Sequence, residues 1–87
     1  MVPTICRFYG ILIQMYFADH GPPHFHVVYN EYKAVIGITD FSVLQGDLPP
    51  KALGLVMEWA RAHRAELLRD WALASQKRQL EPIAPLE

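Results

Sequence analysis

The chain has 87 residues, of which 52% are hydrophobic and 20% are charged, and its formal net charge is −1. This length predicts a single domain, residues 1–87, with a small core, and the composition excludes an intrinsically disordered protein. A charge so close to zero gives no strong overall attraction to nucleic acid, so a nucleic-acid role would require a local basic patch.

The cysteine count and the first residues indicate the compartment. Cys6 is the only cysteine, which excludes an internal disulfide and a cysteine-based zinc site and fits a reducing cytosol. Residues 1–4 lack the basic and apolar regions of a signal peptide, and no apolar run approaches the roughly 20 residues that a membrane span requires. We therefore expect a cytoplasmic protein with no membrane segment.

Two strands are predicted at the start of the chain. Residues 4–8 form a short apolar run, and Tyr9-Gly10 forms a tight connection because glycine tolerates a positive φ. Residues 11–17 then alternate between an apolar and a mixed face, which is typical of a half-buried strand. The predicted apolar face consists of Ile11, Ile13, Met15 and Phe17.

Residues 19–26, Asp-His-Gly-Pro-Pro-His-Phe-His, contain three of the four histidines. The two prolines prevent a paired strand from continuing, so residues 19–23 are predicted to form a loop. A new strand is predicted from His24. Alternate side chains of a strand share a face, so His24 and His26 lie on one face, about 7 Å apart at the backbone. This is the densest cluster of titratable groups in the chain.

A β-hairpin is predicted for residues 24–29 and 32–38. With Asn30-Glu31 as a two-residue loop, Phe25 pairs with Ile36 and His24 pairs with Gly37. Asn30 suits such a turn whereas Glu31 does not, so a longer loop is the alternative. Gly37 is expected to leave open space over the His24 imidazole. The face opposite the histidines would carry Phe25, Val27, Tyr29, Tyr32, Ala34 and Ile36.

The second half of the chain predicts a short edge strand, residues 41–45, followed by a helix. Leu48-Pro49-Pro50 is typical of a helix N-terminus, and apolar residues then recur at helical spacing up to Ala74. A continuous helix over residues 50–76 would be about 40 Å long, whereas a domain of this size has a radius of gyration near 12 Å. The helix therefore overhangs or bends, and His63 is the expected position of the bend.

Four other expectations concern the helix and the tail. We expect His63 to be a core histidine with a satisfied ring and Trp59 and Trp71 to be core residues. Surface ion pairs are expected three residues apart, Glu66 with Arg69 among them. The proline-rich tail, residues 80–86, is expected to dock through its apolar residues. The fold class is α+β: a small antiparallel sheet of four to five strands with one long or broken C-terminal helix packed on one face.

Several blocks of the sequence resemble a known family. They include residues 3–11, the block from Asp19 to His26, residues 58–63, residues 66–71 and residues 83–86. These blocks are similar to small bacterial proteins grouped as domain of unknown function 4160. The resemblance implies no established activity. It implies a gene often paired with a second small gene, an arrangement similar to toxin–antitoxin modules.

The histidine cluster has three interpretations. As a metal site, His20, His24, His26 and Asp19 would supply ligands for Zn²⁺ or a similar ion. As a structural element, the imidazoles would hydrogen-bond the loop and hold the two prolines in place. As a nuclease, the site needs an acid, a base and a cation that stabilises the transition state. The nuclease candidates are His20, His24 and His26 as acid and base, Arg7 or Lys33 as the cation, and Tyr9, Tyr16 or Tyr32 to stack bases.

The preferred hypothesis is a toxin-like component of a two-gene module that uses the histidine cluster on RNA or on a partner protein. The expected partner is the small protein encoded by the neighbouring gene. A homodimer is the alternative assembly. If the protein is an enzyme, an RNA-cleaving hydrolase is the expected class. The alternative is a non-catalytic binding module, in which the cluster holds a metal ion or serves the structure alone.

Overall fold

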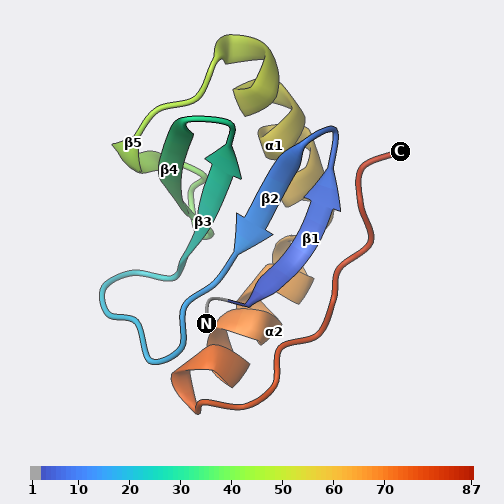
Figure 1. The fold of residues 1–87 in the computed structure, drawn as a ribbon. Helices are drawn as coiled ribbons and strands as arrows, with labels where there is room; N and C mark the ends of the chain where they lie inside the picture. The colour runs from blue at the N-terminus through green and yellow to red at the C-terminus, as the bar shows by residue number, and fades with distance from the viewer. Residues whose placement is uncertain (1–2) are drawn as a thin grey trace.

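The computed structural model describes residues 3–87 and has one antiparallel sheet with two helices behind it (Figure 1). The strands follow chain order across the sheet, so each strand pairs with the next one in the sequence. This confirms the predicted α+β fold with a broken C-terminal helical region. The elements are β1 Thr4–Phe8, β2 Ile11–Gln14, β3 His24–Tyr29, β4 Tyr32–Gly37, β5 Val43–Gly46, α1 Pro50–Ala62 and α2 Arg64–Ser75.

The core lies between one face of the sheet and the helices. Ile13, Phe25 and Val27 of the sheet and Val56 and Trp59 of α1 are all fully buried. The Trp59 ring centroid lies 6.1 Å from that of Phe25, in an edge-to-face arrangement. Burial of these large apolar side chains stabilises the packing of α1 on the sheet. The core position predicted for Trp59 is confirmed.

The β3–β4 hairpin has the predicted register. Phe25 pairs with Ile36 and His24 pairs with Gly37. The loop has only two residues, and the longer-loop alternative is wrong: Asn30 takes a φ of +53°, which asparagine tolerates better than most residues. The open space expected at Gly37 is also wrong, because a Cβ there would lie 3.1 Å from Asp40 Oδ1.

Two strand boundaries differ from the prediction. β2 ends at Gln14 instead of continuing to Phe17, and Phe17 is 42% exposed instead of buried. The chain leaves the sheet here because Ala18 turns with a φ of +53° and donates its N–H to the carbonyl of Ala74 at the end of α2 (2.9 Å). The edge strand β5 begins at Val43 instead of Phe41, whose φ of +57° is incompatible with a strand.

The helical region breaks at His63, as predicted from its length. His63 has φ −121° and ψ 26°, outside the helical range, and separates α1 from α2. Its ring is satisfied, since Nδ1 donates to the carboxylate of Glu66 (2.6 Å), but it is half-buried at the edge of the core. The predicted Glu66–Arg69 pair is wrong, because Arg69 pairs instead with Glu81 of the tail (2.9 Å).

The tail docks on the domain, as predicted. Ile83 is buried and donates its N–H to the carbonyl of Ile5 in β1 (2.9 Å), so the tail runs beside the edge strand (Figure 1). The indole N–H of Trp59 donates to the carbonyl of Ala84 (2.8 Å). The tail therefore covers one side of the core. Neither helix of the described chain has the length and hydropathy needed to cross a membrane.

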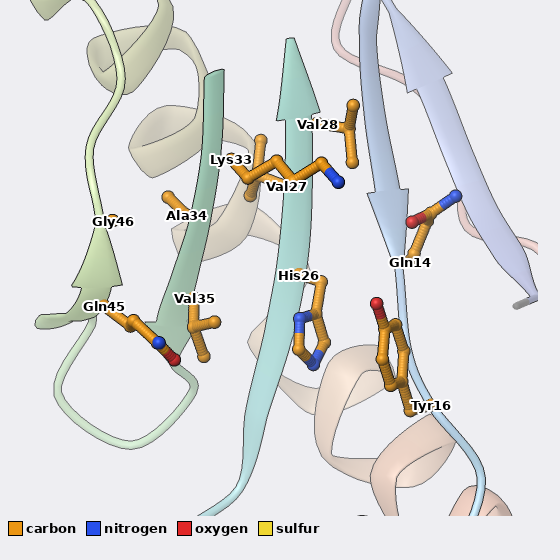
Figure 2. A pocket seen from close by; sticks show the side chains of 10 residues that line it. All are labelled: Gln14, Tyr16, His26, Val27, Val28, Lys33, Ala34, Val35, Gln45 and Gly46. Carbon is orange, nitrogen blue, oxygen red and sulfur yellow. The ribbon is translucent and has the colours of Figure 1, made fainter. Parts of the chain in front are cut away.

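The sheet face opposite the helices bears a row of side chains from four neighbouring strands (Figure 2). The register pairs Gln14 with His26, His26 with Val35 and Val35 with Gln45. Directly paired residues of neighbouring strands share a face, so this row crosses the sheet from β2 to β5. His26 stands in the middle of the row.

Candidate functional site

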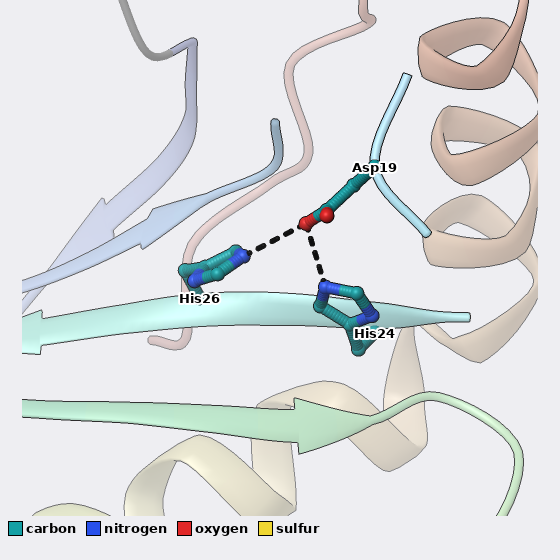
Figure 3. Close-up of side chains that lie close together, drawn as sticks. All are labelled: Asp19, His24 and His26. Atoms are coloured by element: carbon teal, nitrogen blue, oxygen red, sulfur yellow. Dashed lines mark hydrogen bonds and ion pairs between the residues drawn. The ribbon is translucent and has the colours of Figure 1, made fainter. Parts of the chain in front are cut away.

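Asp19, His24 and His26 converge at the end of β3 (Figure 3). The Nε2 atom of His24 lies 2.8 Å from Asp19 Oδ2, and the Nε2 atom of His26 lies 3.3 Å from the same oxygen. One donor atom from each of the three residues lies within 4.8 Å of the other two. Two imidazoles and one carboxylate therefore share a single centre.

The local sequence explains this convergence. Strand alternation places His24 and His26 on one face, and the register places both beside open-face positions of the neighbouring strands. The loop before β3 turns back with Gly21 at a φ of +91°, a value at which a Cβ is strongly disfavoured. This turn carries Asp19 over the start of β3.

Aromatic rings hold both imidazoles in place. His24 is 7% exposed, and its ring centroid lies 4.9 Å from that of Trp71 in α2. The ring of Tyr16 stacks on His26 with a centroid distance of 4.0 Å and an interplanar angle of 11°. The site is thus enclosed on the His24 side, while the His26 and Asp19 side chains keep 20% and 28% of their surface exposed.

Asp19 is held as a carboxylate by its neighbours. Partial burial acts to raise the pKa of its carboxyl group, but hydrogen bonds from His24, from the backbone N–H of His20 and from His26 lower it more, so the pKa lies below its usual value. A carboxylate oxygen at the centre of the cluster attracts a cation, whether a proton on imidazole or a metal ion.

The hydrogen bonds of His24 fix its tautomer. Its Nδ1 lies 2.8 Å from the carbonyl oxygen of Pro22, which can only accept, so Nδ1 carries a proton. A neutral imidazole then has a lone pair on Nε2, and this nitrogen faces the Asp19 carboxylate at 2.8 Å. Two acceptors at this distance require a proton or a metal ion between them.

Not all of the predicted site residues join this centre. The His20 imidazole is exposed and is not among the converging donors; its backbone N–H instead donates to Asp19 Oδ1 (2.9 Å). Arg7 is exposed on the edge strand β1, with β2 between it and the histidines. Tyr9 is 61% exposed in the β1–β2 turn, at the opposite end of the strands.

Two contacts of the site are not predicted from the sequence. Tyr16 is a base-stacking candidate there, but its stacking on His26 is not predicted, although alternation with Gln14 places it on the same face as His26. Trp71 was interpreted as a core residue, and it is half-buried against His24. No local signal links Trp71 to His24, because their contact depends on how α2 packs at the end of the sheet.

Comparison with known proteins identifies the family. A family model described as "Domain of unknown function (DUF4160)" matches residues 10–72, well over half of the chain. The chain belongs to this family. No curated protein and no solved structure matches it. The matched part of this DUF4160 domain contains Asp19, His24 and His26, whereas Arg7 and Tyr9 precede it.

Proposed function

We propose that Asp19, His24 and His26 bind a divalent transition metal ion such as Zn²⁺, and that this centre hydrolyses RNA. The observation that carries the proposal is the convergence of His24 Nε2 and His26 Nε2 on one carboxylate oxygen, Asp19 Oδ2. Imidazole nitrogens and carboxylate oxygens are preferred ligands of zinc. Hydrogen bonding of the other ring nitrogen, here His24 Nδ1 to Pro22, is the usual support of a metal-binding histidine.

The distances suit a single ion. Ligand atoms about 2.1 Å from a tetrahedral ion lie roughly 3.4 Å from one another. The His26 Nε2–Asp19 Oδ2 distance is 3.3 Å and the His24 Nε2–Asp19 Oδ2 distance is 2.8 Å. Metal binding therefore requires a small widening between His24 and Asp19, which lies in a loop. The ligand atoms of the two histidines lie within 4.8 Å of each other, so they can also need to approach one another.

Three protein ligands leave coordination positions for a substrate. Catalytic zinc sites typically have three protein ligands and an open position, whereas structural sites have four. The exposed parts of His26 and Asp19 provide access from the open sheet face. A bound metal would supply an activated water and stabilise negative charge on a phosphodiester. Trp71 and the Pro22 carbonyl would hold His24 in position during the reaction.

A second candidate is acid–base catalysis on RNA without a metal. The specific observation in its favour is the direct His24–Asp19 hydrogen bond, since a carboxylate that orients an imidazole is a common arrangement in catalytic sites. His26 would then be the second titrating group. The non-catalytic alternative is a binding module in which the cluster holds a metal ion or serves the structure alone. It predicts that the His24 and His26 variants keep the full biological effect.

The biological setting is also a proposal. We place the protein in the cytoplasm as the toxin-like half of a two-gene module, with the small protein of the neighbouring gene as its partner. The support for this setting is the family resemblance, which implies a gene paired with a second small gene, together with a site whose residues suit hydrolysis. Arg7 remains a proposed contributor from outside the metal-ligand set, because it adds positive charge to the open face. The His20 ring lies outside the converging donors, and no catalytic role is proposed for it.

The test is expression of the protein in bacteria with and without the neighbouring gene. We expect the native protein alone to inhibit growth and degrade cellular RNA, and the neighbouring gene to relieve both effects. His24→Ala, His26→Ala and Asp19→Asn should each reduce growth inhibition at least about tenfold. Loss of one residue should cost nearly as much as loss of two, because the effects of residues that act as a unit are not additive. His20→Ala is the matched control and should keep most of the activity, because its ring lies outside the converging donors.

Circular dichroism of each variant separates loss of chemistry from loss of fold. Growth without inhibition by the native protein, even in the absence of the neighbouring gene, would end the toxin-like proposal. Full inhibition by a folded double variant lacking His24 and His26 would remove the cluster from the mechanism.

A further inference from the structure

The open sheet face contains a pocket of about 400 Å³ next to the cluster (Figure 2). His26 belongs to both, since it is a member of the cluster and lines the pocket. Val28 and Val35 contribute apolar surface, and Gln14, Lys33 and Gln45 contribute polar groups. This volume falls within the range of about 300–1,000 Å³ that is typical of small-molecule sites.

The formal charge among the residues that line this pocket is positive. Lys33 is the formally charged residue among those that line it, and none of the lining residues is acidic. The neighbouring row of the register pairs Arg7 with Leu12, Leu12 with Val28 and Val28 with Lys33. Arg7 and Lys33 therefore share the open face, about 14 Å apart across three strand spacings. This face provides a local positive region in a chain whose net charge is −1.

The remaining groups match the parts of a nucleotide. Glutamine side chains can donate to and accept from a base edge, as both Gln14 and Gln45 can do here. Tyr16 is 42% exposed, and aromatic rings on open sheet faces stack unpaired bases. Lysine and arginine contact phosphates. An acidic ligand with a flat polar ring fits this set better than a neutral or cationic one.

We infer that the open sheet face binds single-stranded RNA, with one base in the pocket against Tyr16 and with Lys33 and Arg7 on the phosphates. The inference deepens the proposed function and rests on it for the identity of the substrate. His26 lines the base pocket and belongs to the cluster, so a base held there places its own phosphodiester next to Asp19 and His24. The surface thus selects an unpaired strand, because a duplex does not offer its bases to a pocket.

Binding is tested apart from cleavage. The probe is a fluorescent single-stranded RNA of about eight nucleotides, titrated by anisotropy in EDTA and checked for intact length afterwards. We expect Val35→Trp, which fills the pocket, to weaken binding at least tenfold. Lys33→Gln should weaken it about fivefold to tenfold and reduce the slope of log affinity against log salt by about 0.7. Arg7→Gln should reduce that slope similarly.

Matched variants control for surface charge and size. Lys51→Gln removes an exposed lysine on α1, behind the sheet, and Val43→Trp enlarges an exposed valine outside the pocket. Both should bind as the native protein does. Zinc binding by Val35→Trp and Lys33→Gln should be unchanged, because neither residue is a proposed ligand. Val35→Trp and Lys33→Gln should also lose growth inhibition in proportion to their loss of RNA binding.

The outcomes separate the two proposals. Native-like RNA binding by Val35→Trp and Lys33→Gln, or no RNA binding by the native protein, overturns the inference. Equal affinity for DNA or for duplex RNA of the same sequence overturns the inferred specificity for single-stranded RNA. If the protein does not bind RNA and the neighbouring gene's protein protects this face, the face is an interface for that protein instead. RNA binding that depends on the pocket, combined with full activity of folded His24 variants, supports the surface and refutes the proposed catalytic centre.

Discussion

The imidazole of His24 is surrounded by groups that together determine where its protons lie. The Pro22 carbonyl accepts from Nδ1, Asp19 faces Nε2, and Trp71 packs against the ring. Both ring nitrogens of His24 face an oxygen acceptor, and leaving a buried acceptor unsatisfied costs about 1–3 kcal/mol, so the site favours a proton or a metal ion between Nε2 and Asp19. Replacing the second proton with a metal ion satisfies the same geometry. The residue is therefore better suited to bind a cation than to pack as a neutral side chain.

Asp70 provides a residue-scale test of the energetics outside the site. It is 1% exposed; its Oδ1 accepts from the N–H of Glu81 (2.9 Å), whereas its Oδ2 has no hydrogen-bond partner among the described residues. Burial raises the pKa of this carboxyl group, the Glu81 N–H lowers it, and the charges of Glu81 and Glu66 raise it further, against a lowering by Arg69. The ionised form is therefore unfavourable in the folded state.

The raised pKa of Asp70 determines how the stability of the fold changes with pH. Between the unfolded pKa, about 3.9, and the raised folded pKa, the native state binds more protons than the unfolded state, so stability falls as pH rises through this interval. Asp70→Asn removes the charge and can keep the bond to the Glu81 N–H. We expect it to raise the midpoint of thermal unfolding at pH 7, where 1 kcal/mol corresponds to roughly 4–8 °C, and to give little change below pH 4. An equal effect at both pH values would show that ionisation is not the cause.

At the scale of single residues, alternation and proximity predicted part of the site. Strand period placed His24 and His26 on one face, and sequence proximity put Asp19 beside them. The role of His20 was not predictable, because the structure uses its backbone N–H and leaves the ring exposed. A loop residue has no periodicity that fixes the direction of its side chain.

The β3–β4 hairpin is the element that positions the histidines. Its register was predictable because a one-residue slip would place Phe25 and Ile36 on opposite faces of the sheet, and the two-residue loop permits only one pairing of the two apolar faces. The end of β2 was not predictable, since the apolar alternation continues through Phe17 while the backbone turns at Ala18 to meet α2. That turn depends on a contact with a residue far along the chain.

Truncation of the hairpin core should have a large effect. Phe25 is fully buried and packs against Trp59, so Phe25→Ala should lower the free energy of unfolding by roughly 3–5 kcal/mol through lost burial and a cavity. Val28→Ala, on the half-exposed open face of the same strand, is the control and should cost less than about 1.5 kcal/mol. Chemical denaturation measures both. Similar losses for the two variants would contradict the assignment of the faces.

At the scale of the whole molecule, the tail and the helix break close the core. The length of the helical run predicted a bend, because a straight helix would overhang a domain whose radius of gyration is 11.7 Å. Docking of the tail was predictable from its apolar residues, but its partners were not. The Ile83–Ile5 and Trp59–Ala84 bonds join segments far apart in the sequence, and no pattern within the tail specifies them.

The same arrangement leaves the opposite face of the sheet uncovered. The helix α1 packs on one side of the sheet, the tail lies at the edge of β1, and α2 reaches the open face only at the end of the sheet, where Trp71 covers His24. His26 and its row therefore face outward (Figures 1 and 2). A small domain that keeps a cluster of imidazoles and a carboxylate beside an open pocket has a site that a large substrate can reach. The proposed metal centre is the feature on which the proposed chemistry depends.

The most direct test is long-range ¹H–¹⁵N NMR of the histidine side chains, before and after one equivalent of Zn²⁺. This experiment distinguishes a proton on Nδ1, on Nε2 or on both. We expect zinc to leave the His24 proton on Nδ1 and to shift the Nε2 resonances of His24 and His26, while His20 and His63 stay unchanged. A His24 ring that keeps a proton on Nε2 with zinc present, or zinc that leaves both rings unchanged, would contradict the metal centre.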